Sequence, residues 1–120
     1  MAIKLDALQS IEGFIGAAVV DSESGMCLGT IGGGAALDLE VAAAGNCEVV
    51  RAKRKTMQSL KLKDRIEDIL ITLGKHYHLI RPLETNDGVF IYLALNRSQA
   101  NLAMARVRLK EYEKGVDLAA

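Results

Sequence analysis

The stretch GTIGGGAALDLE, which begins at Gly29, is the first part of the chain that could do chemistry. Gly29 and Gly34 have four residues between them, which is the glycine spacing of a phosphate-binding P-loop. A P-loop also needs a Lys for the phosphates and a Ser or Thr for Mg²⁺ directly afterwards, where this chain has Ala35 and Ala36. Glycines alone cannot hold a triphosphate for reaction. We therefore interpret them as a turn with positive φ angles that leads from a strand into a helix near Leu37.

A pair of histidines could bind a metal ion. His76 and His78 are two residues apart in an expected strand, so both side chains point to one face of the sheet. No third or fourth ligand is identifiable, and we interpret the pair as part of a solvated strand face with no metal bound. The carboxylates of Glu67 and Asp68 point to opposite faces if the strand has begun there, so they cannot act as an acid and base pair.

The remaining nucleophilic residue types lack partners in the sequence. Ser22 and Ser24 have neither the glycines of a nucleophile elbow nor a His and an acid at recognisable positions. Cys27 and Cys47 are too far apart for a CxxC motif and have no neighbouring ligands, which indicates reduced, buried thiols. We therefore expect a protein that is not an enzyme and that needs no cofactor.

Length and composition indicate one domain over residues 1–120. Half of the residues are hydrophobic and only one is Pro, so one well-filled core is expected, with no linker. The N-terminus lacks the apolar core of a signal peptide, and no apolar run approaches the ~18 residues of a membrane span. We expect a cytoplasmic protein without membrane insertion. The formal net charge of zero argues against a general polyanion binder, so no nucleic acid partner is expected.

Positive charge is nevertheless concentrated between residues 51 and 65. The segment has a single acid, Asp64, and seven cationic residues: Arg51, Lys53, Arg54, Lys55, Lys61, Lys63 and Arg65. Cations at a helix end oppose the macrodipole favourably, so a solvated helix end explains them. An acidic protein partner also explains them, whereas nucleic acid is disfavoured because no aromatic residues are interleaved for base stacking. The residues that we predict to bind a partner are Arg51, Lys53, Arg54 and Lys55.

The first half of the chain reads as helix, strand, strand, helix. Residues 3–11 form a short helix, and residues 14–20, apolar on both faces, form a central strand. After a turn over residues 21–25, residues 26–31 form the second strand of a hairpin. A long helix from about residue 37 to 60 follows the glycine turn.

The long helix has two apolar rows. One row consists of Ala43, Cys47, Val50, Met57 and Leu60. The other lies about half a turn away and consists of Val41, Gly45, Val49 and Ala52. A helix that lies on one sheet needs only one such row. The second row therefore predicts a second partner, and its small residues would let another helix come close.

Three strands and a helix complete the chain. The strands are expected at residues 66–73, 77–83 and 89–95, and the helix at residues 99–114 with Ser98 as its cap. If the strand 66–73 lies at an edge, it leaves unpaired backbone that a second copy could cover. The resulting fold is an α+β sandwich of order α-β-β-α-β-β-β-α, with a five-stranded antiparallel sheet between one helix and two helices. The predicted interface of a homodimer contains Val41, Gly45, Val49, Ala52, Ile69 and Ile71.

Two stretches, taken with this element order, resemble the roadblock family of dynein light chains and its bacterial relatives. The segment GFIGAAVVDSESGMCLGTIG resembles the first hairpin of that family, where an apolar strand ends in Asp before a Gly-containing turn. The segment DGVFIYLALNRSQANLAMARVRL resembles its last strand and helix. The stretches and the elements between them cover nearly the whole chain.

The resemblance implies a profilin-like fold and a homodimer with a continuous sheet and paired long helices. Bacterial members look like partners and regulators of small Ras-like GTPases, whereas eukaryotic members are adaptors in larger complexes. The family has no nucleotide site or catalytic nucleophile of its own. The function expected from the resemblance is thus a GTPase regulator or adaptor. A ligand-sensing profilin-like module, or a scaffold subunit of a larger complex, is the alternative.

Overall fold

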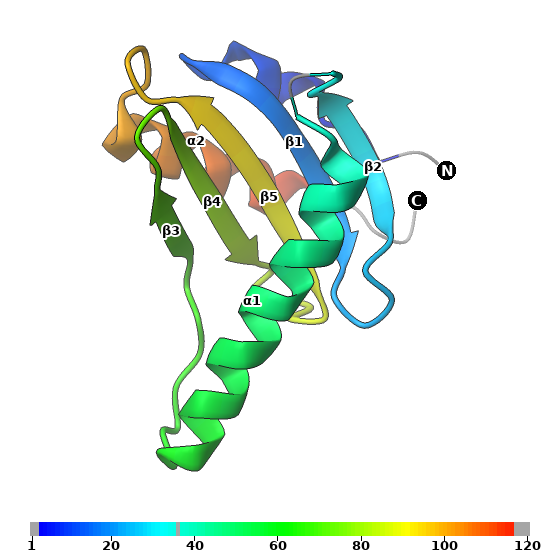
Figure 1. The fold of residues 1–120 in the computed structure, drawn as a ribbon, viewed down its shortest axis with the longest axis vertical. Helices are drawn as coiled ribbons and strands as arrows, with labels where there is room; N and C mark the ends of the chain where they lie inside the picture. Colours follow the sequence, from blue (N-terminus) through cyan, green and yellow to red (C-terminus); the bar gives the residue numbers. More distant parts are fainter. Residues whose placement is uncertain (1–2, 36, 117–120) are drawn as a thin grey trace.

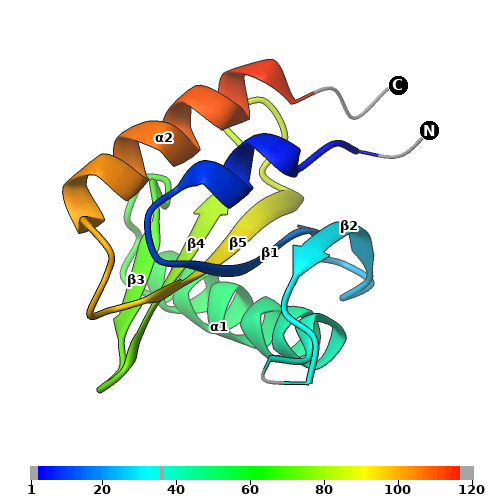
Figure 2. The same ribbon diagram turned by 90° about the horizontal axis from the view of Figure 1, so that it is seen from above.

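The computed structural model, which describes residues 3–35 and 37–116, is a five-stranded antiparallel sheet between two helical layers (Figures 1 and 2). The elements in chain order are the 3₁₀ helix η1 (Asp6–Ser10), β1 (Phe14–Asp21), β2 (Cys27–Gly32), α1 (Leu39–Ser59), β3 (Ile69–Thr72), β4 (His76–Pro82), β5 (Val89–Asn96) and α2 (Leu102–Gly115). The strand order is β2-β1-β5-β4-β3. The predicted sandwich is confirmed, with α1 on one face and η1 and α2 on the other.

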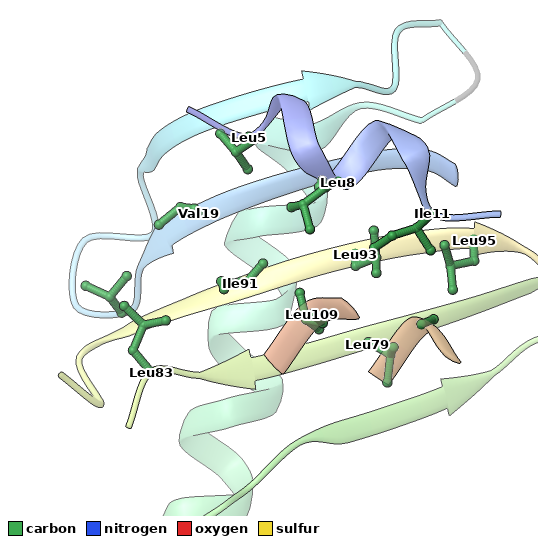
Figure 3. Packing of buried hydrophobic residues seen from close by; sticks show 13 residues of the cluster. Leu5, Leu8, Ile11, Val19, Leu79, Leu83, Ile91, Leu93, Leu95 and Leu109 are labelled. Carbon is green, nitrogen blue, oxygen red and sulfur yellow. The ribbon is translucent and has the colours of Figure 1, made fainter. Parts of the chain in front are cut away.

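The first helical segment is shorter and tighter than predicted. Instead of an α-helix over residues 3–11, five residues form a 3₁₀ helix. Leu8 and Ile11 donate backbone hydrogen bonds three residues back, at 2.9 and 3.1 Å. Because a 3₁₀ helix has three residues per turn, Leu5, Leu8 and Ile11 lie in one line, and all three are buried against the sheet. Figure 3 shows them on the same face as the leucines of β4 and β5.

The long helix α1 covers the opposite face of the sheet only in part. Ala43, Cys47 and Val50 are buried there, as the first apolar row predicts. Farther along, Met57 is half-buried and Leu60 is 61% exposed, because the C-terminal end of α1 runs past the sheet (Figure 1). The first apolar row is therefore buried only as far as Val50, because the sheet does not extend under the rest of α1.

Strand bounds in the second half differ most at β3. This strand begins at Ile69 rather than residue 66, and it lies at one edge of the sheet with β2 at the other. Strand β5 lies in the centre, as its two apolar faces predict, and only its last residue, Asn96, is not buried. The condition set in the sequence analysis, that this strand lies at an edge, is therefore met.

The start of α2 was wrong in the sequence prediction. The helix begins at Leu102, and Asn101 is its cap, accepting a hydrogen bond from the backbone N–H of Met104 at 3.0 Å. The Ser98 hydroxyl donates instead to Asn96 Oδ1 at 2.9 Å, in the turn that leaves β5. Asn96 organises this turn locally, so the helix cannot begin until the turn has ended.

Candidate functional site

The outer row of α1 is uncovered in the single chain. Val41 is 68% exposed, Ala52 is exposed and Val49 is half-buried. Gly45 is exposed as well, and a Cβ atom on it would meet no atom within 4 Å. Val49 also packs against the core beneath α1, whereas Val41, Gly45 and Ala52 are exposed.

A groove lies beside this row, between α1 and the sheet. The backbone of α1 approaches β1 and β2 most closely, and on the α1-side face of β4 Ile80 is buried whereas His78 is only half-buried. The groove has a volume of about 370 Å³, and it is lined by Leu37, Asp38, Val41, Ala42, Gly45, Asn46, His78 and Tyr92. On the edge strand, Ile71 pairs with His78 and Ile69 with Ile80, so both isoleucines lie on the same face as the groove. The predicted helix residues Val41 and Gly45 thus border the groove that Ile71 approaches from the edge strand.

His78 and Tyr92, which line the groove, belong to a chain of hydrogen-bonding side chains that continues to His76 outside the groove. His76 Nδ1 is 3.3 Å from His78 Nε2, and His78 Nδ1 is 3.1 Å from the Tyr92 hydroxyl. Burial, with a smaller contribution from His76, lowers the pKa of His78. Burial raises the pKa of Tyr92 to about 12. The histidines share one face as predicted, but both are half-buried and bonded to each other rather than freely solvated.

No metal cluster accompanies the histidines. Within residues 3–35 and 37–116, no group of three or more His, Cys, Asp or Glu side chains could hold a metal ion.

In the same part of the chain, no helix is long and apolar enough to cross a lipid bilayer.

Two of the four predicted partner-binding residues are engaged within the chain. Arg51 Nη2 donates to the backbone carbonyls of Ser22 and Glu23 in the β1–β2 turn, at 3.1 and 2.9 Å. Arg54 Nη2 donates to the carbonyl of Asp87 in the β4–β5 turn, at 2.6 Å. Both arginines therefore hold α1 against the turns at one end of the sheet. The sequence did not indicate these hydrogen bonds because the acceptors are backbone carbonyls, and every residue has one.

The other two predicted residues, Lys53 and Lys55, are exposed. Residues two apart on an α-helix are about 200° apart around its axis, so Lys53 does not share a face with Lys55 or with Arg51. Arg51 also forms an exposed ion pair with Glu48, at 2.7 Å. The structure therefore does not bring the four residues together into one patch.

The glycine stretch is a turn, as interpreted. Gly32, Gly33 and Gly34 all have positive φ angles, of 73°, 77° and 89°. A Cβ on Gly33 would lie 2.7 Å from the carbonyl oxygen of Leu37, and its N–H donates to Ile15 O at 2.9 Å. That N–H is therefore occupied by the fold rather than offered to a phosphate. Ala36, one of the two P-loop positions, lies outside the described residues.

Both cysteines are free thiols, but the predicted burial holds only for Cys47, because Cys27 is half-buried. Burial, reinforced by Glu40, raises the pKa of Cys27 to about 11. Burial also raises the pKa of Cys47. Both side chains therefore remain protonated near neutral pH, where a thiol is a poor nucleophile.

A buried ion pair between Arg81 and Glu113 was missed by sequence reasoning. Arg81 Nε donates to Glu113 Oε1 at 2.5 Å, and the backbone N–H of Glu84 donates to Oε2 at 2.6 Å. Burial alone would raise the pKa of Glu113, but the Glu84 N–H and the Arg81 guanidinium outweigh it and lower the pKa. The pair joins β4 to the end of α2, so its role is structural.

Comparisons with known proteins bear on the fold. No protein-family model matches the sequence, and no curated protein matches it. Among solved structures, MglB of Myxococcus xanthus superposes with a TM-score of 0.73 at 14% identity, covering 84% of this chain and 72% of that one. A Roadblock/LC7 domain from Streptomyces avermitilis gives 0.76 at 12% identity, covering 91% and 87%. The gliding protein MglB of Thermus thermophilus gives 0.72 at 14% identity, covering 91% and 78%.

These structures share the arrangement of this chain over most of its length despite low sequence identity. The element order and the two stretches noted in the sequence pointed to the same architecture. The chain therefore has the fold of a Roadblock/LC7 domain.

Proposed function

We propose that this chain is a non-enzymatic, homodimeric regulator or adaptor that binds a small Ras-like GTPase. The observation that carries the proposal is the uncovered apolar row of α1 beside the groove. An exposed apolar helix face rimmed by polar residues is typical of a protein interaction surface. A second copy of the chain would cover the row with its own row, as in a symmetric interface.

The charges along α1 support an antiparallel pairing of two such helices. Asp38 and Glu40 lie at its N-terminal end, while Lys53 and Lys55 lie in its C-terminal half. Antiparallel packing would bring the acidic end of one helix near the basic half of the other. The edge strand β3, with Ile69 and Ile71, offers a second contact through unpaired backbone groups. In such a dimer, Lys53 or Lys55 would contact the acidic end of the second copy rather than a GTPase.

The GTPase part of the proposal is supported by the sequence resemblance to bacterial roadblock proteins. Solved proteins named MglB share the fold, and one of them is described as MglB with a tetrameric arrangement, with a TM-score of 0.74 at 14% identity. Assembly of several copies therefore occurs on this fold.

The dimer is tested by Gly45→Glu. The change puts bulk and charge at the centre of the outer row, so we expect a monomer mass by light scattering coupled to size exclusion. Glu has a higher helix propensity than Gly, so the helix itself is not weakened. Ala44→Glu is the matched control, because Ala44 is exposed on another side of the same turn. A dimer mass for Gly45→Glu would mean that this row is not the interface.

The partner is tested by affinity capture from lysate of the source organism, with a non-hydrolysable GTP analogue or GDP present. We expect a Ras-like GTPase whose recovery depends on the nucleotide. Lys53→Glu and Lys55→Glu, made separately, would show which flank of α1 the GTPase contacts. Recovery of other proteins without a GTPase would instead favour a scaffold role.

A further inference from the structure

The C-terminal end of α1 closes with a complete Schellman motif. The backbone N–H of Leu62 donates to Met57 O, and that of Lys61 donates to Gln58 O, both at 3.0 Å. These are the two bonds that define the motif, and Lys61 occupies the position where the chain turns left-handed. We call Met57, Leu60, Lys61, Leu62 and Lys63 the α1 tip.

Lys61 is an unusual residue for that position. Its φ angle is 57°, and among residues 3–35 and 37–116 it is the only non-glycine residue with a positive φ. Glycine is preferred there because a Cβ is crowded in the left-handed region. A lysine kept at a strained position suggests that its side chain has a use outside the fold.

The tip also exposes apolar side chains. Leu60 is 61% exposed and Leu62 is 51% exposed, and Leu62 lines a cavity. The cavity, of about 190 Å³, lies between the end of α1, the return segment and the β4–β5 turn. Its apolar lining consists of Met57, Leu62, Ile66 and Pro82. This volume is large enough for one aliphatic side chain of a partner.

Cationic side chains outnumber acidic ones around these apolar groups: Arg54, Lys61, Lys63 and Arg65 stand against Asp64 and Asp87, which also line the cavity. Lys61 and Lys63 are exposed, and no ion pair involves either of them within the described part of the chain. Arg65 also lines the cavity and has only a long, exposed contact of 3.8 Å with Glu84. A complementary surface is therefore acidic, with an apolar residue at its centre.

We propose that the α1 tip docks an acidic segment of a partner protein, with an apolar partner side chain in the cavity beside Leu62 and partner carboxylates on Lys61 and Lys63. The inference rests on the proposed function and deepens it, because it names the chemistry of the partner. The cavity favours a protein over an anionic membrane, since a lipid surface needs no pocket for a side chain. The tip lies beyond the sheet, past the last residue of the outer row of α1 (Figure 1), which favours a partner over a second copy.

The test uses the full chain and labelled synthetic peptides, with binding followed by fluorescence anisotropy. The probes are a Glu-rich peptide with a central Leu, the same peptide with Ser for Leu, and a Lys-rich peptide with the Leu. We expect the acidic Leu peptide to bind best, and K61E/K63E to weaken it by about tenfold or more. The charge-matched control is K75E/K110E, which changes two exposed lysines elsewhere and should bind normally.

A second variant separates binding from folding. Lys61→Gly relieves the left-handed strain, so its midpoint of unfolding should stay level or rise while peptide affinity falls. L60S/L62S should lose the preference for Leu over Ser in the peptide. Equal weakening by K75E/K110E, or no preference for the acidic Leu peptide, would overturn the inference.

Two further outcomes would assign the tip to another role, and two more would separate this inference from the proposed function. Binding of phosphatidylserine vesicles that K61E/K63E abolishes, without peptide binding, would make it a membrane contact. A change in oligomeric mass with K61E/K63E would make it a contact between copies. GTPase capture that K61E/K63E retains would overturn the tip as the partner site and leave the proposed function standing. Peptide discrimination without GTPase capture by the wild type would contradict the proposed function alone.

Discussion

Arg81 and Glu113 form a salt bridge in which both side chains are only 9% exposed. Removing one partner leaves the other charge buried without compensation, which costs about 3–5 kcal/mol. We therefore expect Glu113→Ala to lower the free energy of unfolding in urea by that amount. Replacing both residues, as in R81M/E113L, should recover most of the loss. A loss of under about 1 kcal/mol for Glu113→Ala would mean that water already compensates the pair, as at an exposed site.

Arg51 and Arg54 show where residue-level prediction stops. Their charge and their place late on the helix were evident from the sequence, and both suggested a surface for a partner. Their hydrogen-bond acceptors are carbonyls of turns about 30 residues away, which become neighbours only when the sheet forms. The residue type shows which hydrogen bonds a side chain can donate, but the tertiary fold determines which acceptors lie within reach. The same limit applies to Tyr92, whose hydroxyl meets His78 only across two paired strands.

At the scale of elements, the spacing of apolar residues predicted which helix faces are buried better than capping residues predicted where helices begin. The two apolar rows of α1 were evident from spacing alone, and Leu5, Leu8 and Ile11 already had the three-residue spacing of a 3₁₀ helix. The residue at which α2 begins was not evident from the sequence. Ser98 and Asn101 are both good capping residues, and the choice between them depends on the turn at Asn96.

That choice gives a prediction for α2. Asn101→Ala removes the side chain that accepts from Met104 N–H, so it should cost about 1 kcal/mol of stability. Asn101→Asp should retain most of the cap. Ser98→Ala removes an exposed bond within the turn and should stay within about 0.5 kcal/mol of the wild type. Thermal unfolding of the three variants decides the matter, and a larger loss for Ser98→Ala would reverse the assignment of the cap.

The layers of the whole molecule followed from burial demands. Strands that are apolar on both faces require helices on both sides, and an antiparallel sheet of five strands can supply those contacts. How far α1 covers the sheet did not follow, because helix length and sheet width are set independently along the chain. That mismatch produces both the groove over β4 and the projecting tip, which are the two surfaces proposed to bind other molecules.

The groove leads to a prediction for the whole assembly, which rests on the proposed dimer. His78 lines the groove with Tyr92 and the carboxylate of Asp38, and His76 contacts it from outside the groove. Its pKa is already below the ordinary 6.5, mainly through burial, and a second copy over the groove would bury it further. The dimer would thus favour neutral His78, and protonation would favour the free chain. The dimer should be tightest above pH 6.5 and weaken as pH falls through the lowered pKa.

Each dimer contains two copies of His78, so the dissociation constant should rise by up to about 100-fold per pH unit once both titrate. Sedimentation equilibrium between pH 8 and pH 5 would measure the rise. His78→Gln keeps a polar side chain without a titrating group, and its dissociation constant should lose most of the pH dependence. His76→Gln is the matched control on the same strand face, because His76 does not line the groove. A dimer as tight at pH 5 as at pH 8 would show that the second copy leaves His78 in contact with water.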